Sequence, residues 1–397
     1  MSNKTISDLV VLDLTRVLAG PFSGMLLADM GATVIKIETP VHGDDSRSFA
    51  PFINGESAYY MNLNRNKKGM TINLKDPDGV SIFLKLVAKA DILIENFRPG
   101  TMEKLGVGYD KLKEINPRLV YGCVSGFGHY GPYSKRAGYD IIGQAMGGLM
   151  STTGWPGGEA TRCGTAISDV LAGLFMTVGV LAAEHRARMT GEGQKVDVAL
   201  VDSVVAGLEI INQIYLSSGR LPGRNGNRYE SIYPYDSFKC SDGSMVIGAG
   251  NDKLYHALCN LMDMPHLIED PRFLTNPLRV KNHSVLKEII EEWLSDKTID
   301  TATNMILEVG VPAGPINTID RVVNDHHIAE VREMFVDMEH PIAGKIKVTG
   351  NPIKLSEDHY EQPESSPQLG EHNVEILQKY LNLSAEEVNA LAAKGAL

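Results

Sequence analysis

The chain has 397 residues, of which 43% are hydrophobic, 22% are charged and 39 are glycine. This is the composition of a folded globular protein, so disordered, collagen-like and coiled-coil classes are excluded. At roughly 100–200 residues per domain, the length predicts two or three domains or one large α/β unit with an insertion. The 38 basic and 49 acidic residues give a net charge of −11, which argues against a nucleic-acid surface but permits a local basic pocket.

Targeting, membrane and cysteine signals come next. The apolar N-terminal stretch contains Asp8, Asp13 and Arg16, which a signal or transit peptide would not carry there. The longest apolar run, Val170 to Ala183, is shorter than the roughly 20 residues that a membrane span needs. The four cysteines are far apart and form no CxxC pair, so neither a disulfide framework nor a zinc site is indicated. We expect a cytoplasmic enzyme with no membrane contact and no bound metal.

Apolar runs and helical periodicity alternate through the first half of the chain. The predicted strands cover residues 9–14, 33–37, 70–74, 91–94, 119–124 and 196–200. The predicted helices cover residues 22–30, 80–89, 140–150 and 169–189, with short helices before residue 115. Asp76-Pro77 supplies a helix start with proline just inside it. Strands that alternate with helices at this spacing predict an α/β fold with a parallel, Rossmann-like sheet.

The character of the sequence changes after Ser217, where a stretch rich in Gly, Pro, Asn and Ser indicates a boundary. The segment DSFKCSDGSMVIGAG then reads as a hairpin that begins a smaller α+β unit. Later signals are helices near 252–263 and 284–296, the hairpin-like MEHPIAGKIKVTG and an amphipathic helix over 373–381. We therefore predict a large domain over 1–217, a small domain with linkers over 218–325 and a final segment over 326–397.

Ligands of open parallel sheets bind where strands end and helices begin. After the first strand, Arg16 to Pro21 could let backbone approach a ligand, although a tight turn needs the same small residues. The basic residues of Asn64 to Lys68, and Lys75, suit phosphates or simply a solvated surface. The segment Glu95 to Gly100 places an amide, an aromatic ring and a guanidinium after a strand, which suits a nucleotide or pantetheine lid.

Asp169 opens the long predicted helix and allows two interpretations. It could be an N-cap that satisfies free helix N–H groups, or a carboxylate nucleophile held at the helix N-terminus; the residues alone leave this open. His129 and the pair His326-His327 have no partners at metal-ligand spacing, so a solvated or structural role is favoured. No GxSxG is present, which disfavours a serine hydrolase.

The whole chain resembles the class III CoA-transferases. This family includes formyl-CoA:oxalate, acetyl-CoA:oxalate, succinyl-CoA:glutarate and carnitine CoA-transferases, with α-methylacyl-CoA racemase as a relative. The matching stretches are VLDLTRVLAGPF, GATVIKIE, HGDDSR, NRNKKGMTINLKDPDG, ADILIENFRPGTMEKLG, INPRLVYGCVSGFG, AGYDIIGQAMGG, the SDV element, GEGQKVDVAL and LGEHN.

The resemblance implies two interlocked chains in a homodimer, each with a Rossmann-like large domain built from both termini, so that 326–397 returns to it. It also implies that Asp169 attacks the donor thioester, giving a mixed anhydride and then an aspartyl-CoA thioester, before the acceptor carboxylate reverses the cycle. Acyl-CoA and a small carboxylate are then substrates, and no cofactor is permanently bound. The helix N-terminus would help to keep the Asp169 carboxylate ionised, whereas burial would oppose it.

Further site residues follow from the same resemblance. Tyr139 and Asp140 match the acyl pocket of the transferases, and Gly248 and Gly250 match a glycine loop that folds over the intermediate. The residues expected along CoA are Val17, Leu18, Ala19, Ile72, Lys75, Asn96, Phe97, Arg98, Lys104, Lys135 and Arg136.

Two departures and two alternatives qualify the resemblance. Thr39 stands where some relatives have arginine, and the glycine loop is only Gly248 to Asn251, shorter than in formyl-CoA:oxalate members. We expect a transferase that moves CoA from an acyl-CoA such as succinyl-CoA or acetyl-CoA to a small carboxylate, and in particular to a dicarboxylate such as oxalate, succinate or glutarate. The alternatives are an α-methylacyl-CoA racemase, disfavoured because Tyr139 replaces the histidine that would move the α-proton, and a non-catalytic CoA-binding protein.

Overall fold

The computed structural model describes residues 4–358 and 362–397 and divides the chain into two compact units. The large unit contains residues 1–149, 162–220 and 325–397, and the second unit contains 150–161 and 221–324. The large unit is therefore built from three separate stretches of chain. The short stretch 150–161 belongs to the second unit, whereas the sequence placed it within the predicted large domain.

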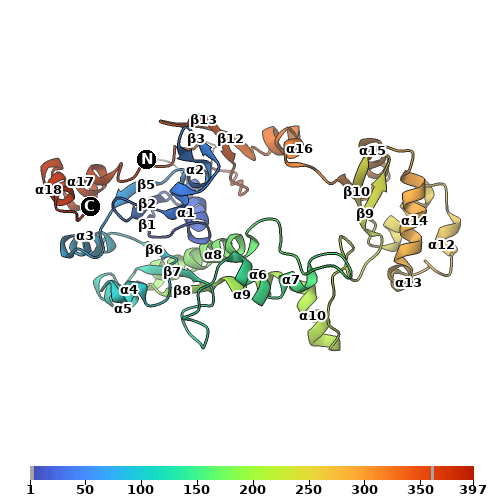
Figure 1. Ribbon diagram of the computed structural model, residues 1–397, viewed down its shortest axis with the longest axis horizontal. Helices are drawn as coiled ribbons and strands as arrows, with labels where there is room; N and C mark the ends of the chain where they lie inside the picture. The colour runs from blue at the N-terminus through green and yellow to red at the C-terminus, as the bar shows by residue number, and fades with distance from the viewer. Residues whose placement is uncertain (1–3, 359–361) are drawn as a thin grey trace. The chain divides into compact units, whose positions relative to one another are not determined.

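A six-stranded parallel sheet forms the centre of the large unit (Figure 1). Its strands are β1 (Val10–Asp13), β2 (Thr33–Glu38), β5 (Lys68–Thr71), β6 (Ile92–Glu95), β7 (Val120–Ser125) and β8 (Lys195–Ala199). The strand order is β5-β2-β1-β6-β7-β8, and every neighbouring pair runs parallel. The predicted α/β class with a parallel sheet is confirmed. Because the order reverses beside β1, the ends of β1 and β6 are where a ligand is expected.

Successive residues of the central strands pack on opposite faces of the sheet. Val11 and Ile92 belong to one core cluster, with helices α1 (Ala19–Asp29) and α8 (Ile167–Thr190). Leu12 and Leu93 belong to the other cluster, with α3 (Pro77–Val87), α5 (Tyr109–Ile115), α17 (Asn373–Leu381) and α18 (Ala385–Ala393). Both faces are thus buried, which explains why these strands read as continuous apolar runs.

The remaining elements of the large unit are short. They are the 3-10 turn Asp45–Ser48, β3 (Phe52–Ile53), β4 (Glu56–Ser57), α2 (Ala58–Asn64), α4 (Thr101–Lys104), α6 (Asp140–Met146), α9 (Leu200–Gly207), α10 (Glu209–Ser218), the π-turn His326–Val331, β12 (Phe335–His340) and β13 (Gly344–Thr349). The predicted hairpin near 338–350 is confirmed as β12–β13. The single helix predicted over 140–150 is wrong: α6 ends before Gly147, and Gly148 adopts φ +92° ahead of α7 (Leu149–Thr152).

Helix α8 is the longest in the described chain. By length and composition alone it could cross a membrane, as could the bent pair α9–α10 taken as one span. In the fold, however, α8 packs on the sheet and on α1 through Ala172, Met176 and Val180, which are fully buried. Its apolar character is therefore that of a core helix.

The second unit has its own sheet and its own core. The sheet has the order β11-β10-β9, from β9 (Tyr235–Cys240), β10 (Gly243–Gly248) and β11 (Ala313–Pro315), all antiparallel. Its helices are α11 (Asp252–Leu261), α12 (His266–Glu269), α13 (Asn276–Lys281), α14 (His283–Leu294), α15 (Ile299–Glu308) and α16 (Ile319–Val323). The predicted hairpin is confirmed in β9–β10, and the core is a separate cluster around Phe238 and Leu286.

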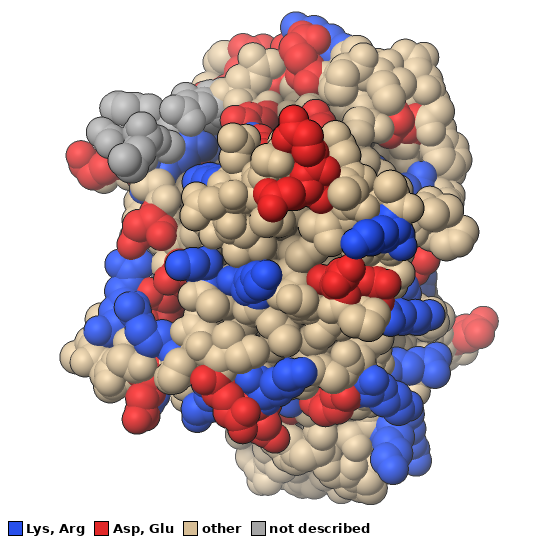
Figure 2. Space-filling view, turned by 90° about the vertical axis from the view of Figure 1, so that its left-hand side faces the viewer, with Lys and Arg blue, Asp and Glu red and all other residues tan. Residues whose placement is uncertain are grey.

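Charged side chains of both signs are interspersed over the face in Figure 2. Lysine and arginine alternate there with aspartate and glutamate over short distances. Such mixing cancels the long-range field of that face. On that face, therefore, attraction of an anionic ligand has to come from a local pocket.

Candidate active site

Acidic side chains end three neighbouring strands of the sheet, and all are buried. Asp13, Glu38 and Glu95 close β1, β2 and β6 with at most 5% of their surface exposed. Two lysines compensate part of this charge: Lys67 Nζ lies 2.9 Å from Asp13, and Lys36 Nζ lies 2.8 Å from Asp44. Burial opposes ionisation of Asp13, but Lys67 and Lys36 lower its pKa below the usual value. Buried ion pairs therefore lie along the edge of the sheet where the strands have their carboxyl-terminal ends.

The basic residues between α2 and β5 do not have either predicted role. Arg65 is buried and pairs with Asp29 at 2.6 Å, and Lys67 is buried against Asp13. Burial lowers the pKa of Lys67 to about 8, although Asp13 acts in the opposite direction. Both residues are held inside the unit by their carboxylates, so the phosphate-binding and solvated-surface interpretations are wrong for them.

The loop after β1 is held from two sides. Val17 adopts φ +68°, an unusual conformation for a β-branched residue, and its N–H donates to Asp44 Oδ1 at 3.0 Å. The Asn96 side chain accepts from Arg16 N at 2.8 Å and donates to Arg16 O at 2.7 Å. Asn96 thus fixes the Arg16 backbone, which makes it a support of this loop.

Asp169 lies in the first turn of α8 but is not its N-cap. The N-cap position is Ala166, which has no side-chain capping bond, and Asp169 is the third residue of the helix. The N-cap interpretation is therefore wrong. The Asp169 carboxylate is half-buried beside the positive end of the helix dipole.

Asp140 supplies the missing cap from the neighbouring helix. Its Oδ1 accepts from Ser168 N at 2.9 Å and from Ser168 Oγ at 2.7 Å, while Oδ2 accepts from Gln144 Nε2 at 2.7 Å. These bonds join the starts of α6 and α8. Burial and the negative Asp140 together raise the pKa of Asp169 to about 7. Of the two influences expected at Asp169, burial prevails over the helix N-terminus, and the negative Asp140 adds to it.

Two tyrosines belong to this region. Tyr139 precedes α6 and is 77% exposed, so its ring is free to meet a ligand. Tyr59, which the sequence analysis missed, lies on α2 and packs on the Met25–Leu26–Leu63 cluster. Burial, Asp169 and Asp44 raise the pKa of Tyr59 to about 12. Asp169 is therefore close enough to Tyr59 to affect its ionisation. The sequence analysis missed this because no local sequence signal relates α2 to α8.

The other residues expected along CoA divide into buried and exposed ones. The side chain of Ile72 is 1% exposed and lies in the core. Phe97 packs on the same core. Arg136 lies over the Tyr133 ring at 3.6 Å. The remaining basic residues are exposed: Lys75, Arg98, Lys104 and Lys135.

The two expected loop glycines belong to the second unit. Gly248 is the last residue of β10 and pairs with Tyr235, and Gly250 precedes Asn251, the N-cap of α11. A Cβ on Gly248 would meet the Tyr235 ring at 3.5 Å, an ordinary contact. Packing within this unit therefore does not require glycine at 248.

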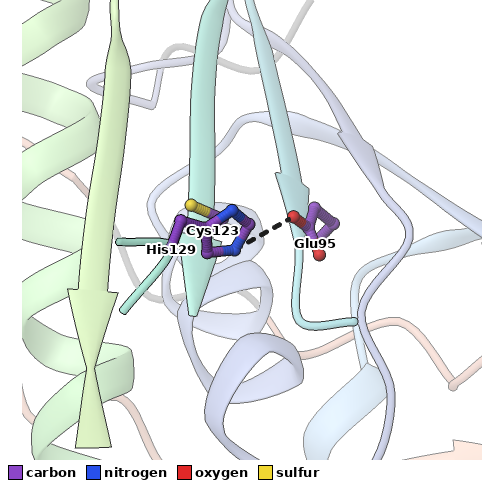
Figure 3. A group of neighbouring side chains, drawn as sticks. All are labelled: Glu95, Cys123 and His129. Carbon is purple, nitrogen blue, oxygen red and sulfur yellow. Dashed lines mark ion pairs between the residues drawn. The ribbon is translucent and has the colours of Figure 1, made fainter. Parts of the chain in front are cut away.

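A compact polar group lies under the ends of β6 and β7 (Figure 3). The donor atoms of Glu95, Cys123 and His129 lie within 4.8 Å of one another, and the His129 ring points across to Glu95. The His129 side chain is only 10% exposed, so a solvated role is excluded. Histidine, cysteine and glutamate are zinc ligands, but Lys195 Nζ lies 2.9 Å from His129 Nδ1. A cationic donor at that nitrogen favours a hydrogen-bonded cluster over a metal site.

Comparisons with known proteins agree over nearly the whole chain. The sequence model of a family described as "CoA-transferase family III" matches residues 6–373. Human "Succinyl-CoA:glutarate CoA-transferase" is 38% identical over 393 residues, 99% of this chain and 90% of that protein. "Acetyl-CoA:oxalate CoA-transferase" of Acetobacter aceti is 40% identical over 375 residues, 94% of this chain and 95% of that protein.

A solved structure gives the same result. The crystal structure of a CAIB/BAIF family protein from Brucella suis matches with a TM-score of 0.84 and 38% identity. The match covers 96% of this chain and 100% of that one. The similarity therefore includes both compact units.

Proposed function

This chain belongs to CoA-transferase family III, and from that premise we propose that it moves CoA to a small dicarboxylate through a covalent intermediate on Asp169. Transfer of CoA between an acyl-CoA and a carboxylate is the activity of the family. The observation that supports Asp169 is its place: a half-buried carboxylate in the first turn of α8, next to a second carboxylate that is already occupied by Ser168 and Gln144.

The proposed cycle conserves charge and needs no external acid or base. The Asp169 carboxylate attacks the donor thioester, which breaks the C–S bond, forms a mixed anhydride and releases the CoA thiolate. The thiolate then attacks the Asp169 carbonyl, which gives an aspartyl-CoA thioester and frees the donor acid. The acceptor carboxylate attacks this thioester to form a second anhydride, and the thiolate takes the new acyl group and restores Asp169.

The chain's own residues would assist at two points. Asp140 accepts from Ser168 and so is held away from the ligand as a structural carboxylate, leaving Asp169 to react. The raised pKa of Asp169 makes its anion a stronger base and hence a stronger nucleophile than an ordinary aspartate. The exposed Tyr139 ring would line the acyl pocket, and Val17 to Ala19 would present backbone to CoA.

The dicarboxylate class follows from the named activities of the relatives. The human and Acetobacter relatives are described as acting on succinyl-CoA with glutarate and on acetyl-CoA with oxalate. Identities of 38% and 40% indicate the reaction type but do not identify the acceptor acid. We therefore propose oxalate, succinate and glutarate as the first acceptors to test, with succinyl-CoA and acetyl-CoA as donors.

The decisive experiment traps the intermediate. The protein is incubated with succinyl-CoA or acetyl-CoA, treated with hydroxylamine or borohydride, and analysed by intact-protein and peptide mass spectrometry. We expect a modification on Asp169 that is absent in Asp169→Asn, whose side chain has the same shape. An unmodified protein that exchanges the α-hydrogen of a 2-methylacyl-CoA would instead support the racemase alternative. CoA binding without either reaction would support a binding protein.

We further propose that the enzyme is a homodimer. Helix α8 exposes Leu174, Phe175 and Val178 although its other side is core, and α10 has no buried residue. Tyr215 and Leu216 of α10 are 52% and 72% exposed. Apolar surface of this extent is typical of a protein–protein interface, and the interlocking of two chains implied by the resemblance would cover it.

The cytoplasm is the proposed location. The four cysteines are all free thiols, and free thiols persist in reducing compartments. Cell fractionation with an antibody against the native protein tests this.

A further inference from the structure

The carboxylate of Glu95 fixes the turn that follows β6. Its Oε2 accepts from the backbone N–H of Phe97 at 2.7 Å, and its Oε1 accepts from the Tyr121 hydroxyl at 3.0 Å. Glu95 is 1% exposed, so water does not compete for these bonds. The path of the chain into Phe97 and Arg98 is therefore set by one buried charge.

The same turn also holds the loop after β1. Asn96, between Glu95 and Phe97, bonds both the N–H and the carbonyl of Arg16. Movement of the β6 turn would carry Asn96 with it and release the Arg16 backbone. Two segments that the family resemblance places along CoA are thus tied to Glu95.

His129 brings a third segment to the same point. It lies on the loop after β7, which leads to Lys135 and Arg136, and its backbone N–H donates to Asp197 at 2.8 Å. Its Nδ1 lies 2.9 Å from Lys195 Nζ. Because an ammonium group only donates, Nδ1 must accept and Nε2 carries the proton of the neutral ring.

This proton points at Glu95. Nε2 of His129 is buried, has no hydrogen-bond partner among the described residues, and lies 3.8 Å from Glu95 Oε1, beyond hydrogen-bond length (Figure 3). A metal at Nε2 would require the proton to move to Nδ1, where it would face the Lys195 ammonium. The cluster is therefore suited to an electrostatic contact between this N–H group and the Glu95 carboxylate, and not to a metal ion.

We propose that Glu95 and His129 are positioning residues which together hold the three loops after β1, β6 and β7 in the arrangement that binds CoA. This inference rests on the proposed function for the identity of the ligand. Neither residue has to touch the reacting atoms, so the expected effect is on CoA affinity and not on the acylation of Asp169.

The pair should make CoA binding depend on pH. Burial raises the pKa of Glu95 to about 7, against the bonds from Phe97 and Tyr121, and burial and Lys195 lower the pKa of His129. The ionisable groups around Glu95 are Tyr121 and Cys123 on β7, His129 after it, Lys195 and Asp197 on β8, and Glu103 on α4. As pH falls through about 7, Glu95 takes up a proton, its acceptor charge is lost and the loops loosen.

Calorimetric titration with CoA tests this in full-length protein. Asp169→Asn is present in every sample, so no acylation occurs and Asp169 does not titrate. Adding Glu95→Gln should weaken CoA about tenfold at pH 8, the cost of one charge-assisted bond of about 1.4 kcal/mol, and the difference should nearly vanish at pH 6. The 3′-phosphate of CoA titrates in the same range, so the readout is the ratio of the two Kd values at each pH.

Two matched comparisons separate positioning from general damage. His129→Ala should weaken CoA, and His129→Gln, which keeps a donor toward Glu95, should restore most of the affinity. Cys123→Ala removes a side chain that is equally buried and that donates to Val196 O and Asp197 Oδ1 of strand β8. It leaves the bond from His129 N to Asp197 Oδ2 in place, so it should lower Tm and leave the Kd unchanged.

Three results would overturn the inference: a Kd ratio that does not change with pH, a loss in Cys123→Ala as large as in Glu95→Gln, or stoichiometric zinc that Cys123→Ala removes. Failure of Asp169 to become acylated in otherwise wild-type protein would reject the proposed function instead. The two failures are read in different experiments.

Discussion

At Asp169, the proposed nucleophile, the environment of the carboxylate should make activity depend on pH. Burial and Asp140 raise the pKa of Asp169 to about 7, and only the anion is a nucleophile. The rate of aspartyl modification at saturating acyl-CoA should therefore fall about tenfold per pH unit below pH 7 and level off above it. In Asp140→Asn, which keeps an acceptor for Ser168, the fall in rate should begin at a lower pH. An unchanged pH–rate profile would contradict the role of Asp140.

The same shift predicts a stability change. The pKa of Asp169 is higher in the folded chain than its ordinary 3.8, so the folded state keeps the proton while the unfolded state loses it. Ionisation of Asp169 therefore lowers the free energy of unfolding. This loss is complete above pH 7 and absent below pH 4. Asp169→Asn should raise the free energy of unfolding by about 1–2 kcal/mol at pH 8, discounted for partial exposure, with the gain fading toward pH 4.

Thermal unfolding across this pH range measures the effect. Glu114→Gln, an exposed change on α5, is the control and should show no such gain. An Asp169→Asn gain that is equal at pH 4 and pH 8 would show that the carboxylate is not destabilised by its surroundings.

Several individual roles lay beyond local sequence reasoning. Position 169 could be recognised as a helix start, but the cap of this helix comes from Asp140, which lies 28 residues before its partner Ser168. Arg65 and Lys67 look like surface residues because their partners Asp29 and Asp13 are 36 and 54 residues away. Burial of a charged side chain depends on such distant partners, which periodicity does not reveal.

At the scale of elements, the crossing of α1 and α8 depends on Gly173. A Cβ there would lie 2.6 Å from the Ala19 carbonyl and 3.1 Å from the Phe22 ring. Gly173→Ala should therefore lower the free energy of unfolding by about 2 kcal/mol through overpacking, and displace the end of the β1 loop so that CoA binds more weakly.

Chemical denaturation and CoA titration of the variant test both effects. The control is Gly314→Ala in β11, where a Cβ would meet nothing within 4 Å, so its effect should stay within about 0.5 kcal/mol. If both variants lose the same stability, the crossing does not need glycine.

Among the elements, apolar pattern predicted the strands of the large sheet to within about one to three residues at each end, because both sheet faces are buried. The strand order was not predicted, since periodicity carries no information on which strands are neighbours. Helix α18 was missed although Ser384 and Glu387 form a capping box that the sequence displays. Helix α2 was missed because its seven residues are too few for a periodic signal.

For the whole molecule, the exposed face of α8 predicts the oligomeric state. Light scattering after size exclusion should give twice the mass of one chain. Val178, 67% exposed, should be covered by the partner, so Val178→Glu should shift the protein toward monomer by placing a charge in an apolar interface. Ser81→Glu on α3 adds the same charge at an exposed polar position and should leave the mass unchanged. A dimer that survives Val178→Glu would place the interface elsewhere.

The edge strand β5 pairs with β2 on one side, and on its other side His372 donates to Gly69 O at 2.9 Å and accepts from Gly69 N at 3.1 Å. These partners are 303 residues apart. A ribosome that adds about 5–20 residues per second needs roughly 15–60 s to cover that distance. Throughout this interval the strand can pair with another nascent chain, while all of 221–324 emerges. Crowded polysomes and slow translation should therefore lower the yield of this protein through aggregation before its chemistry is affected.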